Sequence, residues 1–287
     1  MIAITGAPGA LNGRTAEHLL RTVPASELTI IARDPARAER FARAGATVRA
    51  GRYEDPDGLR HAFAGVDRVL LVSSNDPGAD TVALHRNAIE AAVAAGVDRV
   101  IYTSHQGADP DSPFPPARVH AATEAILADA APHWTALRNG FYAHSLEWLL
   151  GSWRSSGVIT VPADGPVSWT SRDDVAEAAA VLLSGVALPD GPVTLTAPAA
   201  PRFVDLADTA SEVAGRSIGF EIVDAEQWVR LAVDAGQPEL RARFSVTIFQ
   251  AAERGLFAGT DPLLGTLLGR APSSVREALA APDRSAT

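Results

Sequence analysis

The chain has 287 residues, 47% hydrophobic and 21% charged, which is the balance of a globular protein with one large or two modest domains. It contains no cysteine, and all 25 basic residues are arginine, so disulfides, thiolate nucleophiles, sulfur-based metal sites and lysine Schiff bases are excluded. The net charge of −9 argues against nucleic-acid binding, and no apolar run approaches the roughly 18 residues of a membrane span. We therefore expect a cytoplasmic protein with no membrane or nucleic-acid partner and no metal site.

Apolar runs alternate with helical segments through the first 140 residues. We predict strands at 1–5, 28–32, 46–50, 68–72, 99–103 and 134–137. We predict helices at 16–20, 34–44, 57–64, 81–95 and 117–130. Parallel strands need crossover helices, so this alternation predicts an α/β fold of Rossmann type, a doubly wound parallel sheet covered on both faces.

The second half of the chain is less regular. Prolines interrupt short elements, and we predict helices at 173–183, 203–214, 225–235 and near 239–254. The division expected is an NAD(P)-binding domain over residues 1–150 and a smaller, mostly helical substrate lobe over 151–287, partly interleaved with the first.

A glycine turn follows the first strand and precedes a helix. In that context Gly6 and Gly9 indicate a loop whose backbone N–H groups bind a pyrophosphate. Two residues depart from the usual pattern: Pro8 lacks an N–H, and Asn12 stands where a third glycine would allow close helix packing, with Gly13 one position late.

The residue after the second strand indicates which cofactor is bound. Arg33 suits a ribose 2′-phosphate and so favours NADP over NAD, with Arg37 as a second positive charge. Asp34 is either a ribose-binding acid or, because Pro35 follows it, the cap of the next helix.

Polar residues also follow the fourth and fifth strands, at Ser73, Ser74 and Asn75 and at Ser104 and His105. Ligands bind at this edge of open α/β sheets, although such residues are common in any loop. His120 and Glu124 are four residues apart on one helix, as either an orienting pair for proton transfer or a structural pair.

The sequence resembles the NmrA-like, atypical branch of the short-chain dehydrogenases, and within it the bacterial type 2 NAD(P)H:quinone oxidoreductases. The likeness covers nearly the whole chain. The segments that carry it are Met1 to Gly6 with Gly9, 23–26, Arg33, 62–66, Val119-His120 with 122–124, 137–139 with Tyr142, 172–183, and Gly236 with 238–239.

The resemblance implies NADPH binding and hydride transfer to a quinone or an electron-poor enone. It places the cofactor on the phosphate loop (Gly6, Ala7, Pro8, Gly9, Ala10, Leu11), on Arg33, on Ser73, Ser74 and Asn75, and on Leu137, Arg138 and Asn139. Arg52 departs from the acid usual near the adenine.

The Tyr-x-x-x-Lys pair of short-chain dehydrogenases is missing, so alcohol–ketone chemistry by that route is not expected. The resemblance makes His120, with Tyr102 or Ser104 nearby, the candidate for orienting the substrate or stabilising its oxyanion. Four aromatic residues, Phe141, Tyr142, Trp148 and Trp153, form either a wall for a flat substrate or the core of the lobe.

Two other functions are compatible with the same residues. One is a non-catalytic NADP sensor that regulates a protein partner, and the other is an isomerase or lyase on the same fold. The sequence is compatible with either a monomer or a homodimer.

Overall fold

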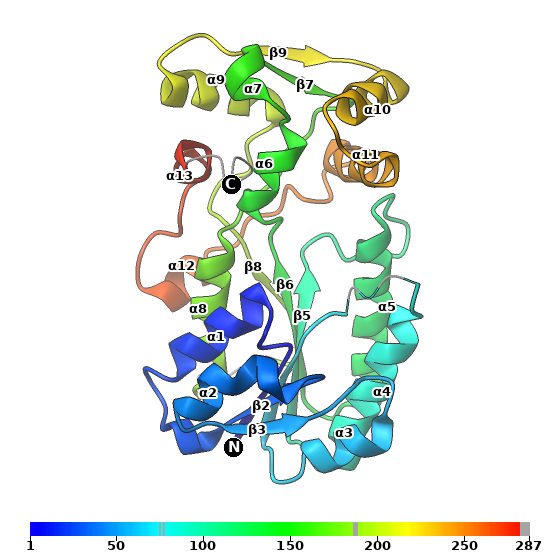
Figure 1. The fold of residues 1–287 in the computed structure, drawn as a ribbon, viewed down its shortest axis with the longest axis vertical. Coiled ribbons are helices and arrows are strands. Elements are labelled where there is room, and N and C mark those ends of the chain that lie inside the picture. Colours follow the sequence, from blue (N-terminus) through cyan, green and yellow to red (C-terminus); the bar gives the residue numbers. More distant parts are fainter. Residues whose placement is uncertain (75, 77, 186–188, 282–287) are drawn as a thin grey trace.

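A seven-stranded parallel sheet forms the base of the molecule (Figure 1). The computed structural model describes residues 1–74, 76, 78–185 and 189–281. The strand order is β3-β2-β1-β4-β5-β6-β8, and every pairing is parallel. The strands of this sheet are β1 (Ile2–Thr5), β2 (Leu28–Ala32), β3 (Thr47–Ala50), β4 (Arg68–Leu71), β5 (Arg99–His105), β6 (Trp134–Asn139) and β8 (Gly191–Leu195).

Helices cover both faces of the sheet, as the alternating sequence predicts. One face carries α1 (Ala10–Leu19), α2 (Glu39–Arg43), α8 (Arg172–Leu183) and α12 (Leu263–Leu268). The other carries α3 (Pro56–Ala62), α4 (Thr81–Ala94) and α5 (Pro115–Ala130). Short 3₁₀ helices lie at η1 (Ala25–Glu27), η2 (Pro35–Ala38) and η3 (Ala143–Ser145). Two hydrophobic cores result, one on each side of the central strands.

A smaller lobe stands above the carboxyl ends of the strands (Figure 1). Its helices are α6 (Leu146–Leu149), α7 (Trp153–Ser156), α9 (Phe203–Ala214), α10 (Ala225–Asp234), α11 (Glu239–Glu253) and α13 (Val275–Ala280). A two-stranded parallel sheet, β7 (Val158–Val161) with β9 (Gly219–Ile222), completes it. A third core, rich in Phe and Trp, fills the lobe.

The second half of the chain also completes the sheet domain. β8 pairs with β6, α8 packs on α1, and α12 packs on α8. The chain therefore leaves the sheet domain after β6, forms the first part of the lobe, and returns to add α8 and the edge strand β8.

Some local predictions needed correction. The first helix begins at Ala10 rather than 16, directly after the glycine turn. The segment predicted as one helix over 34–44 is a 3₁₀ helix, η2, followed by α2. β7, β8, β9, α6, α7, α12 and α13 were not predicted, because each is short and acquires its partners only through tertiary packing. Within the part of the chain described, no helix is long and apolar enough to cross a membrane.

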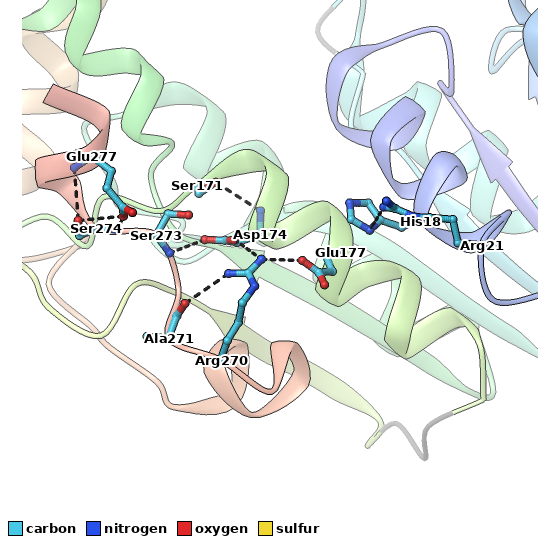
Figure 2. A network of polar contacts seen from close by, with 10 residues as sticks. All are labelled: His18, Arg21, Ser171, Asp174, Glu177, Arg270, Ala271, Ser273, Ser274 and Glu277. Carbon is cyan, nitrogen blue, oxygen red and sulfur yellow. Dashed lines mark hydrogen bonds and ion pairs between the residues drawn. The ribbon is translucent and has the colours of Figure 1, made fainter. Parts of the chain in front are cut away.

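A polar network fastens the segment between α12 and α13 to the sheet domain (Figure 2). Arg270 Nη2 donates to Asp174 Oδ1 at 2.9 Å and to Glu177 Oε2 at 2.6 Å. The buried Asp174 also accepts from the Ser273 backbone N–H through Oδ2 at 2.6 Å. The chain then enters α13, where Arg154 of the lobe donates to Leu279 O and Ala281 O. This segment therefore ties the lobe to α8.

Candidate cofactor-binding and active site

The turn after β1 has the backbone shape that a phosphate-binding loop requires. Gly6 has a φ of +66°, and a Cβ built there would lie 2.5 Å from Val72 Cγ1. Only glycine fits this position. The Gly9 N–H donates to Gly6 O at 2.8 Å and closes the turn.

The N-terminus of α1 follows this turn and has no side-chain cap. Gly9 occupies the N-cap position, and no side chain accepts from the first N–H groups of the helix. Those donors, with the positive end of the helix dipole, suit an anionic group. Ala7 is buried beneath the loop, Ala10 is exposed at the start of α1, and Leu11 packs on the sheet core.

Asn12 and Gly13 together hold α1 close to the loop, which is the role of the third glycine in the usual pattern. Asn12 is buried, and its Nδ2 donates to Thr5 O at 2.7 Å, which ties α1 to the end of β1. A Cβ built at Gly13 would lie 2.7 Å from Ala7 O, so the close approach of helix and loop depends on this glycine. The altered pattern therefore preserves the packing of the loop.

An open cavity of about 330 Å³ lies between the ends of β2, β1 and β4. It is lined by charged residues at one end, namely Arg33, Asp34, Arg37, Glu54 and Asp76. Asp34 Oδ1 accepts from the Ala36 N–H at 3.1 Å, so of the two roles that the sequence left open this carboxylate takes the helix cap. Arg52 is exposed and is not among the lining residues.

Arg33 lies at this cavity but already has a partner. Its Nη1 donates to both carboxylate oxygens of Asp76, at 2.8 and 2.9 Å. The hydrogen bond from Arg33 lowers the pKa of Asp76, and the same bond raises the pKa of Arg33. Nothing in the sequence pattern marked Asp76 as its partner.

The loop after β4 is held by side chains of β5 and α4. The Ser73 N–H donates to Thr103 Oγ1, and the Ser74 N–H donates to His85 Nε2, each at 2.8 Å. Ser73 and Ser74, which the resemblance places beside the middle of the cofactor, both line the cavity. Asn75, predicted beside them, lies outside the described residues.

Tyr102 and His120 form a hydrogen-bonded pair between β5 and α5. Tyr102 Oη lies 2.8 Å from His120 Nδ1 and 3.5 Å from His85 Nδ1. Since His85 Nε2 accepts from Ser74, the proton of His85 is on Nδ1, which donates to Thr123 Oγ1 at 2.8 Å. We assign the Tyr102 hydroxyl as the donor to His120 Nδ1, which places the proton of His120 on Nε2.

Burial controls the charge of this pair. It lowers the pKa of His120 well below its usual value, and the neighbouring His105 and His85 lower it further. It also raises the pKa of Tyr102 and lowers the pKa of His85 to about 4. At neutral pH the tyrosine is protonated and both imidazoles are uncharged.

His105, one of the polar residues that the sequence analysis placed after the fifth strand, lies at the end of β5 beside His120. Its ring stacks on that of His120, with centroids 6.1 Å apart, and its Nδ1 accepts from the Gly107 N–H at 3.1 Å. Its proton is then on Nε2, and burial lowers its pKa to about 4. Phe114, Phe141 and Phe257 surround the ring at centroid distances of 5.2–5.7 Å. Its position at the end of a strand was the signal available in the sequence.

Ser104 and Glu124 belong to a separate, buried contact. Ser104 Oγ donates to Glu124 Oε1 at 2.6 Å, and Arg138 donates to both carboxylate oxygens of Glu124. His120 and Glu124 thus take different partners. Leu137 is buried in the sheet core, and Asn139 is buried with Nδ2 donating to Tyr142 Oη at 3.3 Å.

Three of the four aromatic residues predicted as a wall or a core belong to the lobe core or pack against it, and Tyr142 packs against the core of the sheet domain. Phe141 packs directly on His105. Trp153 is buried in the lobe core, and Trp148 packs on the outside of that core beneath Arg241. Tyr142 contacts Asn139 and the ring of His144.

A second, larger cleft of about 850 Å³ begins at Pro8 and Gly9 and runs toward the lobe. Its walls carry arginines and carboxylates from α1, α8, α13 and the α6–α7 region. In the described parts of the chain, no group of three or more His, Asp or Glu residues is placed to hold a metal ion.

The glycine turn, the uncapped α1 and the cavity at the carboxyl edge of a doubly wound sheet define a dinucleotide-binding protein of Rossmann type. Residues 6–184 match the model of a family described as NAD(P)H-binding. The chain belongs to this NAD(P)H-binding, NmrA-like family of oxidoreductases.

Relatives named as oxidoreductases match over almost the whole chain. Quinone oxidoreductase 2 of Escherichia coli is 33% identical over 97% of both chains. An NmrA-like family domain-containing oxidoreductase of Aspergillus flavus is 31% identical over 96% of this chain and 92% of its own.

Solved structures agree with these relatives. The E. coli NADPH-dependent quinone oxidoreductase in complex with NADPH has a TM-score of 0.90 at 33% identity, covering 98% of this chain and 99% of its own. Triphenylmethane reductase of Citrobacter sp. with NADP(H) has a TM-score of 0.89 at 32% identity, covering 98% and 100%. The predicted family and fold class are confirmed.

Proposed function

We propose that this protein reduces quinones or electron-poor enones with NADPH as the hydride donor. The observation that carries the proposal is the Tyr102–His120 pair, whose neutral imidazole lies at the carboxyl edge of a sheet shared with NADPH-bound quinone oxidoreductase. The substrate is then a small molecule with a conjugated carbonyl group.

The chain offers matching groups for each part of NADPH. The N–H groups of Gly9 and the first turn of α1 would hold the pyrophosphate, and Arg33 the 2′-phosphate. Ser73 and Ser74 would lie beside the middle of the cofactor, and Asn139 at its nicotinamide end. When bound, NADPH supplies a hydride to the acceptor.

His120 acts in this proposal as a hydrogen-bond donor to the acceptor's oxygen. Because its pKa is low and its Nδ1 accepts from Tyr102, the group available is the neutral Nε2–H. Such a donor stabilises the developing oxyanion without giving up its proton, and solvent then protonates the phenolate or enolate. Quinones need no stronger acid because they are already electrophilic.

Tyr102 is a positioning residue, since its hydroxyl fixes the tautomer of His120. We place Ser104 outside the reacting groups because its hydroxyl is bonded to Glu124. His105 stacks on His120 and Phe141 packs edge-on against His105, so an aromatic acceptor beside His120 would meet a mostly apolar cluster of rings.

The test is NADPH oxidation followed by absorbance with benzoquinone, naphthoquinone and a simple enone as acceptors. We expect turnover with at least one acceptor, and a large loss of it in His120→Ala with NADPH affinity retained. Tight NADPH binding with no turnover on any acceptor would contradict the proposal and favour the sensor function.

A further inference from the structure

The ion pair between Arg33 and Asp76 spans the adenosine end of the proposed cofactor site. Arg33 follows β2 and Asp76 follows β4, and these strands flank β1, whose end carries the glycine turn. Both side chains line the 330 Å³ cavity. The pair therefore joins the two sides of the cavity into which the cofactor would enter.

The hydrogen bonds of the pair show which donor and acceptor atoms of Arg33 and Asp76 are already in use. A single nitrogen of Arg33, Nη1, serves both oxygens of Asp76. Asp76 is held in turn by the Ser74 hydroxyl, which donates to Oδ2 at 3.0 Å. The Arg33 side chain is 58% exposed and that of Asp76 31%, so water screens the pair and it opens at low cost.

Negative charge outweighs positive charge at this end of the cavity. The cavity lining includes two arginines, Arg33 and Arg37, and three carboxylates, those of Asp34, Glu54 and Asp76. A 2′-phosphate bound to Arg33 would meet the Asp76 carboxylate on the same guanidinium, whereas a cofactor with a free 2′-hydroxyl would meet no such repulsion.

We propose that Asp76 is a specificity-determining residue that competes with the 2′-phosphate for Arg33 and so narrows the preference for NADPH over NADH. The inference rests on the proposed function, because it takes Arg33 as the 2′-phosphate contact. The inference adds that the preference for NADPH over NADH depends on Asp76 as well as on Arg33.

The test is Asp76→Asn, which removes the charge and keeps the shape, with binding measured by calorimetry. NADPH should bind roughly three- to tenfold more tightly, with NADH changed less than about twofold. Adenosine 2′,5′-bisphosphate and AMP should show the same contrast, since they probe the adenosine end without the nicotinamide. Glu54→Gln removes a charge from the same cavity without an ion pair to Arg33, and we expect a smaller gain.

Arg33→Ala is the second variant of this test. It should weaken NADPH selectively, and Asp76→Asn added to it should give a smaller gain than in the wild-type chain. An unchanged or lower NADPH-to-NADH affinity ratio in Asp76→Asn, with a normal melting temperature, would overturn the role of Asp76. If the wild-type chain bound neither dinucleotide, the proposed function would fall first, and this inference with it.

Discussion

His120 shows how burial sets the chemistry available to one residue. A histidine in water titrates near pH 6.5, but here its pKa is lowered by burial and by two neighbouring imidazoles. With its Nδ1 occupied by Tyr102, this side chain is a fixed, uncharged donor. The proposed function uses this side chain to stabilise negative charge rather than to deliver a proton.

The first prediction concerns the pH dependence of turnover. If an imidazolium of ordinary pKa protonated the product, the rate would fall as pH rises through 6.5. Because His120 is neutral over this range, we expect kcat to stay within about twofold between pH 6 and pH 8. Steady-state kinetics in buffers of constant ionic strength would measure it, and a tenfold decline over that range would contradict the assignment.

The second prediction separates His120 from Tyr102. His120→Ala should lower kcat by roughly a hundredfold to a thousandfold, as expected for the loss of one oxyanion donor, with the NADPH dissociation constant little changed. Tyr102→Phe should have a smaller effect, because the imidazole stays but its tautomer is no longer fixed. Equal effects on cofactor affinity and on kcat would instead indicate a structural role for both residues.

At the scale of elements, the packing of the glycine turn depends on how closely α1 approaches it. The sequence displaces the third glycine by one position, from 12 to 13. The structure shows that Gly13 provides the close contact with the Ala7 carbonyl, while Asn12 supplies an added hydrogen bond to β1. The helix can therefore start directly at the loop.

The third prediction is that Gly13→Ala lowers both stability and NADPH affinity. Alanine favours a helix by about 1 kcal/mol, but its Cβ would lie 2.7 Å from Ala7 O and push the loop away from α1. Gly265→Ala in α12 is the control, since its Cβ would meet nothing closer than 3.5 Å. Thermal unfolding and calorimetry would measure both variants, and a stabilised Gly13→Ala with normal affinity would refute the packing argument.

The fourth prediction concerns the segment between α12 and α13 (Figure 2). Asp174→Asn should lower the free energy of unfolding by about 1–3 kcal/mol, because Arg270 loses its buried charged partner. Glu177→Gln removes the other, more exposed partner of Arg270 and should cost less than about 1 kcal/mol. Denaturant titration would compare the two variants, and a larger loss of stability in Glu177→Gln would show that Asp174 is not the main partner of Arg270.

For the whole molecule, buried neutral histidines link folding to pH. His85 and His105 have pKa values of about 4 in the folded protein, against 6.5 in the unfolded chain. Between these values the unfolded chain binds more protons, so stability is fully present above pH 6.5 and is lost as pH falls toward 4.

The fifth prediction states how steeply the free energy of unfolding falls as the pH is lowered. Each of the two histidines should lower the free energy of unfolding by about 1.4 kcal/mol per pH unit across this window. Denaturant titrations at pH 7, 6 and 5 would measure it. His105→Leu should reduce the slope, because it removes one of the two groups that bind a proton on unfolding. A flat profile in the wild-type chain would show that these histidines are protonated in the folded protein.

The sequence alone determined the features that depend on local order along the chain. The alternation of strands and helices, the glycine turn and Arg33 after β2 each follow from neighbouring residues. The fold class followed from them, whereas the family came from a resemblance along nearly the whole chain. Backbone geometry and hydrophobic periodicity act over a few residues, so they can be read from the sequence.

Only the tertiary structure decided which distant side chains meet. Arg33 with Asp76, Tyr102 with His120 and His105 beside His120 are contacts between different strands, helices and loops. The same holds for β8, which joins the sheet only after the chain has passed through the lobe. Such contacts depend on packing over the whole chain, and packing determines the burial that leaves His120 neutral.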